Sequence, residues 1–176
     1  MKKLIIISLI ALIATGCKKF VVSDDIIVHD NYVGIPMEEY DNLIMYFMIK
    51  DNVATFVSVS YRGSGEIDLI IPSYIHINGE EYIVKNINIG YGPFELPHDL
   101  HSVTIPNTVI DIGREAFYHC DNLCYITCLS TIPPNINTPL FNNYTFPTIY
   151  VPKESVGLYK VINGWKEYSS YIVGIE

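Results

Sequence analysis

The feature that most constrains the fold of this chain is a repeat of apolar residues with a period of 23 positions. Phe94 recurs as Phe117, and Leu100 recurs as Leu123. A unit of this length is too small to bury its own apolar face, so neighbouring units must stack and share a core. We therefore expect a mainly β fold, a short solenoid of 23-residue units with an N-terminal β-hairpin cap and a short C-terminal helical cap.

The best-formed unit begins at Leu100 and predicts where each side chain points. Val103 and Ile105 should point into the core from a strand that Pro106 ends, because proline cannot donate to a ladder. Gly113 should permit a corner of the coil. A second apolar wall and the back of the coil are expected from the following residues: Val109, Ile110, Ile112, Ala116, Phe117 and Cys120.

Segments before and after the regular units are expected to close the solenoid. Strands over 43–50 and 53–59 should flank a two-residue turn, and Asn78-Gly79 is the strongest short hairpin signal in the chain. Near the C-terminus, residues 154–162 are typical of a short helix, and Trp165 should serve as a cap residue rather than a ligand anchor.

The N-terminus has the features of an export signal. Lys2 and Lys3 precede the apolar run 4–14, which is too short to span a hydrocarbon core of roughly 30 Å. The run ends in Ala14-Thr15-Gly16-Cys17, which resembles a bacterial lipoprotein signal. The resemblance implies cleavage before Cys17 and acylation of this residue, which would anchor the protein in a membrane.

These features divide the chain into three parts. Residues 1–16 are expected to be the signal peptide, residues 17–42 the lipidated cysteine and a tether that packs down in places, and residues 43–176 the repeat domain with its capping segments. The alternative is a soluble secreted protein in which Cys17 merely lies near the cleavage point.

Charge and composition restrict the partners. The formal net charge is −8, and loss of the two lysines in the signal makes it about −10, which argues against binding to nucleic acid. Tyrosine is abundant, with 14 residues, and this suits contact with sugars or proteins as well as a simple role in strands. The expected partners are a protein or glycan ligand and, through the lipid anchor, a membrane.

The repeat also resembles a known family. The BspA-like leucine-rich repeats of bacterial surface proteins read approximately LxxVxIPxxVxxIGxxAFxxCxxL, and residues 100–123 match this unit in full. Short lipoproteins of Bacteroides-type bacteria carry similar opening and closing segments, so the resemblance extends from about residue 43 to the end. Two departures are Leu129, where proline is expected, and Phe141, which arrives one residue late. The resemblance implies a leucine-rich-repeat solenoid on a lipoprotein of the outer membrane, at the cell surface or on the periplasmic side.

Alternation along the repeat strands predicts a candidate ligand-binding strip on the outer face. If Val103 and its equivalents point inward, two columns of outward residues should lie side by side, with Asp68 and Ile70 at one end. Hydroxyl and aromatic groups of this kind make an adaptable binding surface, although they are also good residues for any exposed strand. The candidate residues are Ser102, Thr104, Tyr125, Thr127, Thr148 and Tyr150.

Metal and cofactor chemistry is not expected. His98, His101, His119, Cys120 and Cys124 gather in one part of the chain, but they contain no CxxC pair, and Cys120 occupies a structural position of the repeat. Cys124 and Cys128 are too far apart along a strand to form a disulfide, and Cys120 could pair with Cys124 only if the turn between them folds back. The expectation is reduced cysteines, two of them buried.

Catalysis is not expected either, because the chain contains no GxSxG, GxxxxGK or HExxH motif. The leading hypothesis is therefore a membrane-anchored, non-catalytic binding or adhesion module. The alternatives are a structural or accessory envelope lipoprotein that partners another envelope component, and a lipid-anchored enzyme.

Overall fold

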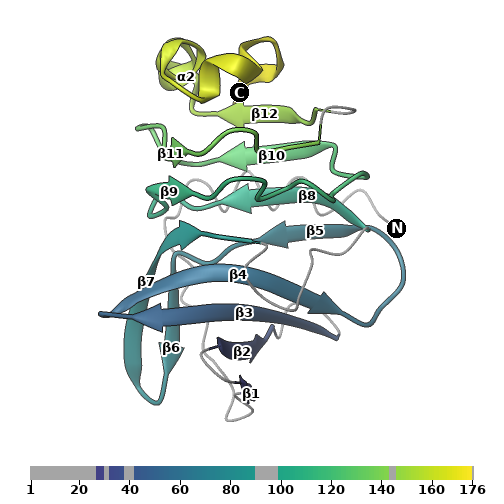
Figure 1. The fold of residues 1–176 in the computed structure, drawn as a ribbon, viewed down its shortest axis with the longest axis vertical. Helices are drawn as coiled ribbons and strands as arrows, with labels where there is room; N and C mark the ends of the chain where they lie inside the picture. Colours follow the sequence, from purple (N-terminus) through teal and green to yellow (C-terminus); the bar gives the residue numbers. More distant parts are fainter. Residues whose placement is uncertain (1–26, 30–31, 38–41, 90–98, 143–145, 176) are drawn as a thin grey trace.

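The computed structural model describes residues 27–29, 32–37, 42–89, 99–142 and 146–175 (Figure 1). The expected signal peptide, the expected anchor residue Cys17, and the residues Phe94 and His98 lie outside these ranges. Within the described ranges, no helix is both long enough and apolar enough to cross a membrane.

The first wall of the solenoid is a parallel five-stranded sheet (Figure 1). Its strands follow one another along the long axis in this order: β5 (Ile67–Ile70), β8 (Leu100–Ile105), β10 (Tyr125–Cys128), β12 (Thr148–Val151) and β13 (Ile172–Gly174). From β8 onward, each residue pairs with one 23 positions further along the chain: Ser102 with Tyr125, Tyr125 with Thr148, and Ile149 with Ile172.

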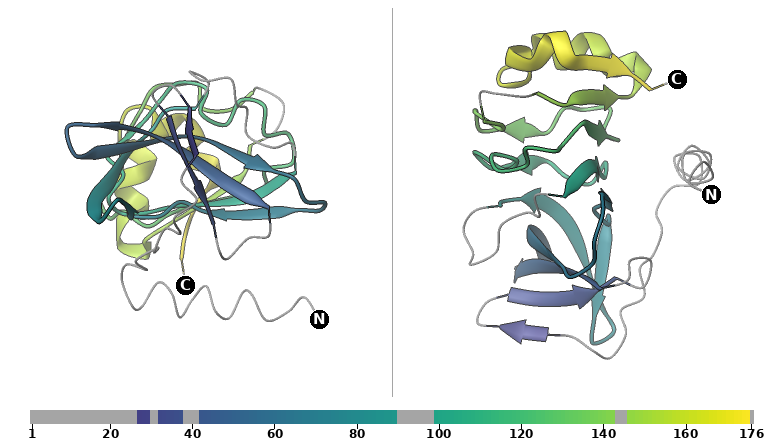
Figure 2. Two further views of the ribbon diagram at one scale, coloured as in Figure 1. Left: turned by 90° about the horizontal axis from the view of Figure 1, so that it is seen from below. Right: turned by 90° about the vertical axis from the view of Figure 1, so that its right-hand side faces the viewer.

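The second wall belongs to a larger sheet that also contains the N-terminal hairpins. Its core strands are β7 (Glu80–Ile87), β9 (Asp111–Ile112) and β11 (Asn135–Ile136), with β6 (Tyr74–Ile77) paired to β7. Strand β4 (Val53–Tyr61) pairs with β7 in parallel. On its other side β4 pairs with the first of the antiparallel strands, which follow in this order: β3 (Leu43–Lys50), β2 (Tyr32–Pro36) and β1 (Ile27–His29). The hairpins lie beneath the stack in the side view (Figure 2).

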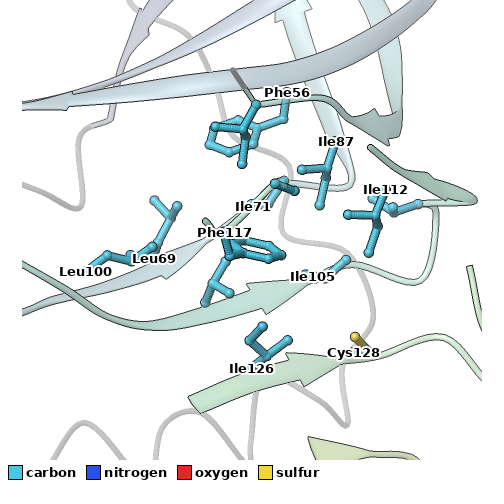
Figure 3. Close-up of a cluster of buried hydrophobic side chains, with 14 of the residues drawn as sticks. Phe56, Leu69, Ile71, Ile87, Leu100, Ile105, Ile112, Phe117, Ile126 and Cys128 are labelled. Atoms are coloured by element: carbon cyan, nitrogen blue, oxygen red, sulfur yellow. The ribbon is translucent and has the colours of Figure 1, made fainter. Parts of the chain in front are cut away.

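Apolar side chains from both walls fill the space between them (Figure 3). Ile105 and Ile126 enter from the first wall and Ile87 and Ile112 from the second, and all four are almost fully buried. Phe117 closes the back, stacked on Phe141 of the next unit with ring centroids 6.0 Å apart. The hydrophobic core is one cluster that runs from Ile35 in the hairpins to Ile172 in the last strand.

The expected hairpins are present at the expected turns. Asp51 and Asn52 both have positive φ, at 50° and 60°, and they connect β3 to β4. Asn78 and Gly79 also have positive φ, at 52° and 84°, and they connect β6 to β7. Two consecutive positive φ angles are typical of the tight turns whose twist matches that of a hairpin.

Helical segments cover the other end of the stack (Figure 2). They are η1 (Lys153–Ser155), α2 (Val156–Val161) and η2 (Trp165–Tyr171). Two large side chains in these segments are fully buried, and each donates a hydrogen bond to a backbone carbonyl. Tyr159 Oη donates to the Ser130 carbonyl at 2.9 Å, and Trp165 Nε1 donates to the Pro134 carbonyl at 2.7 Å.

Two expectations for the repeat unit need correction. Ile110 does not face the core but is 55% exposed, because only Val109 and Ile112 of this apolar run can point inward at the corner. The Ile110 N–H instead ties the backbone to the second wall by donating to the Lys85 carbonyl at 2.8 Å. Gly113 does not have a positive φ at this corner; a Cβ there would lie 2.5 Å from Asn88 Oδ1, so the Asn88 side chain would have to shift.

The folded part also begins before residue 43. Strands β1 and β2 lie in the segment expected to be a tether, and β2 pairs with β3 over its whole length, from Tyr32 with Met48 to Pro36 with Ile44. At the other end, β13 adds a strand that was not expected from the sequence.

Candidate functional site

The outer face of the five-stranded sheet carries the predicted residues in two columns, which we call the strand strip. The first column contains Asp68, Ser102, Tyr125 and Thr148, and each of them pairs in register with the next. The second column contains Ile70, Thr104, Thr127, Tyr150 and Val173, paired in the same way. The side-by-side arrangement expected from the 23-residue spacing is therefore present.

Three rings form a row across the middle of the strand strip. Tyr125 is 42% exposed, and its ring centroid lies 6.1 Å from that of Tyr150 on the next strand, with an interplanar angle of 35°. On the other side, His101 meets Tyr125 edge to face at 5.4 Å. The row thus crosses β8, β10 and β12 and presents an aromatic surface.

Polar groups flank this row. Thr148 is paired in register with Tyr125, and Thr127 with Tyr150, so each tyrosine has a hydroxyl at the directly facing position of the neighbouring strand. Beyond them, Ser102 Oγ donates a hydrogen bond of 2.6 Å to Asp68 Oδ1. None of the outward positions of the strand strip carries lysine or arginine.

Two members of this surface were missed by sequence reasoning as binding residues. His101 was considered only as a metal ligand, and its contact with Tyr125 depends on a neighbouring strand. Val173 is 45% exposed and extends the second column because β13 continues the sheet. A signal for it was present, since Ile172 stands 23 residues after the buried Ile149, but no repeat motif surrounds it.

The cysteines differ in their surroundings. Cys120, Cys124 and Cys128 are all free; Cys120 and Cys128 are buried, whereas Cys124 is exposed directly before Tyr125. Burial raises the pKa of both buried thiols to about 12, and the negative charge of Asp121 adds to this effect at Cys120. These two thiols therefore stay protonated and unreactive at neutral pH.

The backbone brings His101 and Cys124 to equivalent positions on adjacent repeat units. The Cys124 N–H donates to the His101 carbonyl at 2.8 Å, as expected for equivalent positions of adjacent units. Among the described residues, no three His, Cys, Asp or Glu side chains are grouped so that they could hold a metal ion. His98, the remaining candidate ligand on this side, lies outside the described ranges.

Comparison with known proteins identifies the repeat. Residues 87–160 match the family model described as BspA type leucine rich repeat region (6 copies). No curated protein matches the chain. The mainly β leucine-rich-repeat fold expected from the sequence is confirmed, and residues 87–160 match the BspA-type repeat that the sequence resembles.

Solved structures similar to the chain include two bacterial leucine-rich proteins. A leucine rich cell surface protein from Faecalibacterium prausnitzii shares 21% identity over 87% of this chain, with a TM-score of 0.36, and the chain spans 30% of the length of that protein. A leucine-rich repeat protein from Bacteroides capillosus also shares 21% identity, over 73% of this chain and 99% of that one, with a TM-score of 0.41.

Proposed function

We propose that this protein is a membrane-anchored, non-catalytic binding module that contacts a protein or glycan ligand through the strand strip. The observation that carries the proposal is the row of Tyr125 and Tyr150 on a parallel sheet, with threonine residues in register beside both tyrosines. Tyrosine offers a large, rigid contact area at little cost in conformational entropy, and nearby Ser and Thr groups supply adaptable hydrogen bonds.

The way in which the fold presents these residues supports the same function. Buried residues such as Val103, Ile126 and Ile149 alternate with the outward ones, so packing of the core holds the backbone under the strip. A site on regular strands is more rigid than one on loops, and less freedom is lost when a ligand binds.

Anchoring through Cys17 and a position at the cell surface complete the proposal. They rest on the sequence Ala14-Thr15-Gly16-Cys17, and the similarity to a cell surface protein is consistent with them. We expect Cys17→Ala to move the protein from the membrane fraction to the soluble fraction of the cells, and protease treatment of intact cells to degrade the anchored wild type. Protection from protease would favour the alternative, an accessory lipoprotein on the periplasmic side.

Binding of the purified full chain to arrayed glycans and matrix proteins tests the function directly. A ligand found in this way should lose about tenfold or more in affinity with the Tyr125→Ala/Tyr150→Ala double variant, because truncation of central aromatic anchors costs 1–2 kcal/mol or more. Tyr118→Ala is the matched control, since Tyr118 is similarly exposed at 37% but lies outside the strand strip. Equal affinity of the double variant and the wild type would contradict the assignment of the strip.

A further inference from the structure

Resting on the proposed function, we propose that the strand strip binds a neutral glycan, an extended chain of pyranose sugars that lies across the strands with sugar rings against Tyr125 and Tyr150. This assignment selects one of the two ligand classes of the proposed function. It follows from the size of the strip, its charge and the order of its side chains.

The size of the strip suits a narrow polymer better than a folded protein. Five strands at about 4.8 Å spacing make the strip roughly 19 Å long, and two outward residues on one strand are only about 7 Å apart. A stable protein–protein interface buries about 800 Å² on each partner, which is several times the area that two such columns offer. An extended chain one sugar wide would instead be in contact with the strip along its whole length.

The charge of the strip favours a neutral ligand. The outward positions contain no lysine or arginine to neutralise a sulfate, a phosphate or a sugar carboxylate. The one charged residue in the columns, Asp68, is negative, and it accepts the hydrogen bond from Ser102 at the β5 end. The whole chain also has a formal charge of −8, so a polyanionic glycan would meet repulsion at long and short range.

The order of the side chains matches the two kinds of surface on a pyranose ring. The C–H groups on one face of the sugar are apolar and pack on an aromatic ring, while the hydroxyls project from its edge. Tyr125 and Tyr150 supply two such rings on successive strands, 6.1 Å apart and tilted by 35°. Thr148 and Thr127 stand in register beside them, where their hydroxyls would meet the edge of a sugar that lies on either ring.

The test uses the purified full chain and defined oligosaccharides in isothermal titration. Cellohexaose, laminarihexaose and mannohexaose are the neutral probes, and a heparin hexasaccharide is the anionic one. We expect binding to at least one neutral probe, with an affinity that changes little between low and high salt, and no binding to heparin. Tyr125→Ala and Tyr150→Ala should each weaken binding about tenfold, whereas the Tyr→Phe variants, which keep the rings, should lose less than threefold.

Controls separate the ligand assignment from folding and from the broader function. Tyr118→Ala should bind like the wild type, and the fluorescence of Trp165 should show that every variant is folded. If no neutral probe binds while a protein ligand is lost in the Tyr125/Tyr150 double variant, the glycan assignment is overturned and the proposed function stands. If a neutral probe binds the double variant as well as the wild type, both the glycan assignment and the strip as the binding site are overturned.

Discussion

Two buried side chains at the C-terminal end, Tyr159 and Trp165, each donate a hydrogen bond to a backbone carbonyl, and these bonds hold the helical segments on the stack. Tyr159 and Trp165 reach back by 29 and 31 residues to Ser130 and Pro134, and their rings pack edge to face at 5.1 Å. Burial raises the pKa of Tyr159, so its hydroxyl stays a donor over the whole neutral range.

Removal of the Tyr159 hydroxyl should be costly because it leaves a buried acceptor without its donor. We expect Tyr159→Phe to lower the free energy of unfolding by about 1–3 kcal/mol. Urea unfolding followed by far-UV circular dichroism measures the change. Tyr118→Phe, at an exposed position, should change stability by less than about 0.5 kcal/mol, and a similar loss in both variants would count against the buried hydrogen bond.

The two buried thiols predict a loss of stability at alkaline pH. Below pH 9.0, Cys120 and Cys128 are protonated in both the folded and the unfolded chain. Above it, the unfolded chain releases these protons while the folded chain retains them until about pH 12, so the free energy of unfolding falls through this range. Each thiol should contribute a slope of up to about 1.4 kcal/mol per pH unit.

The contribution of one thiol is isolated by substitution. Cys128→Ala should reduce the difference in unfolding free energy between pH 8 and pH 10.5, although the smaller side chain lowers stability at both values. Cys124→Ala, at the exposed cysteine, provides the comparison. An alkaline slope that is unchanged in Cys128→Ala would show that this thiol does not titrate with unfolding.

At the scale of elements, the turn between α2 and η2 depends on one glycine. Gly164 has φ of 84°, and a Cβ there would lie 2.5 Å from Cγ1 of Ile136. Gly157, within α2, has open space where its Cβ would be. A side chain larger than hydrogen is therefore excluded at Gly164 but can be accommodated at Gly157.

We expect Gly164→Ala to destabilise the protein by about 1–3 kcal/mol, since it adds backbone strain to a steric clash. Gly157→Ala should stabilise it by up to about 1 kcal/mol, because alanine is the better helix former. Thermal unfolding of the two variants beside the wild type gives the comparison. A stabilised Gly164→Ala variant would contradict the conformation of this turn.

The elements that sequence reasoning found are those that repeat or turn locally. The register of Ser102, Tyr125 and Thr148 follows from their 23-residue spacing, and the hairpin turns follow from Asp51-Asn52 and Asn78-Gly79. Strands β1, β2 and β13 depend on pairing with partners and carry no repeat motif of their own. The exposure of Ile110 was missed because an apolar run at a corner does not reveal which side chain is left outside.

At the scale of the whole molecule, the N-terminal hairpins and the repeats share both a sheet and a core. Strand β4 pairs with β7, and Phe56 of β4 is fully buried and pairs in register with Ile87 (Figure 3). Because repeat proteins transmit stability through neighbouring contacts, a continuous core of this length predicts that the molecule unfolds as one unit.

The single tryptophan makes this cooperativity measurable. Phe56→Ala should destabilise the protein by about 3–5 kcal/mol, since it leaves a cavity in the core. Trp165 lies at the other end of the stack. Its fluorescence should show an unfolding transition shifted by the same amount as the transition of all strands measured by circular dichroism. If the Trp165 transition stays at its wild-type position in Phe56→Ala, the two ends unfold independently.

The helical segments and β13 together occupy one 23-residue step, since Ile149 pairs with Ile172 just as Tyr125 pairs with Thr148. The spacing of 23 residues between paired strands is thus kept even where the connecting segment consists of helices instead of loops. A chain with one extra copy of residues 103–125 inserted directly after Tyr125 would keep the 23-residue phase and gain a strand, while both ends stayed unchanged. Each such duplication would lengthen the outer face by about 4.8 Å. The length of the outer face therefore depends on the number of repeat units, and no unit has to change its sequence.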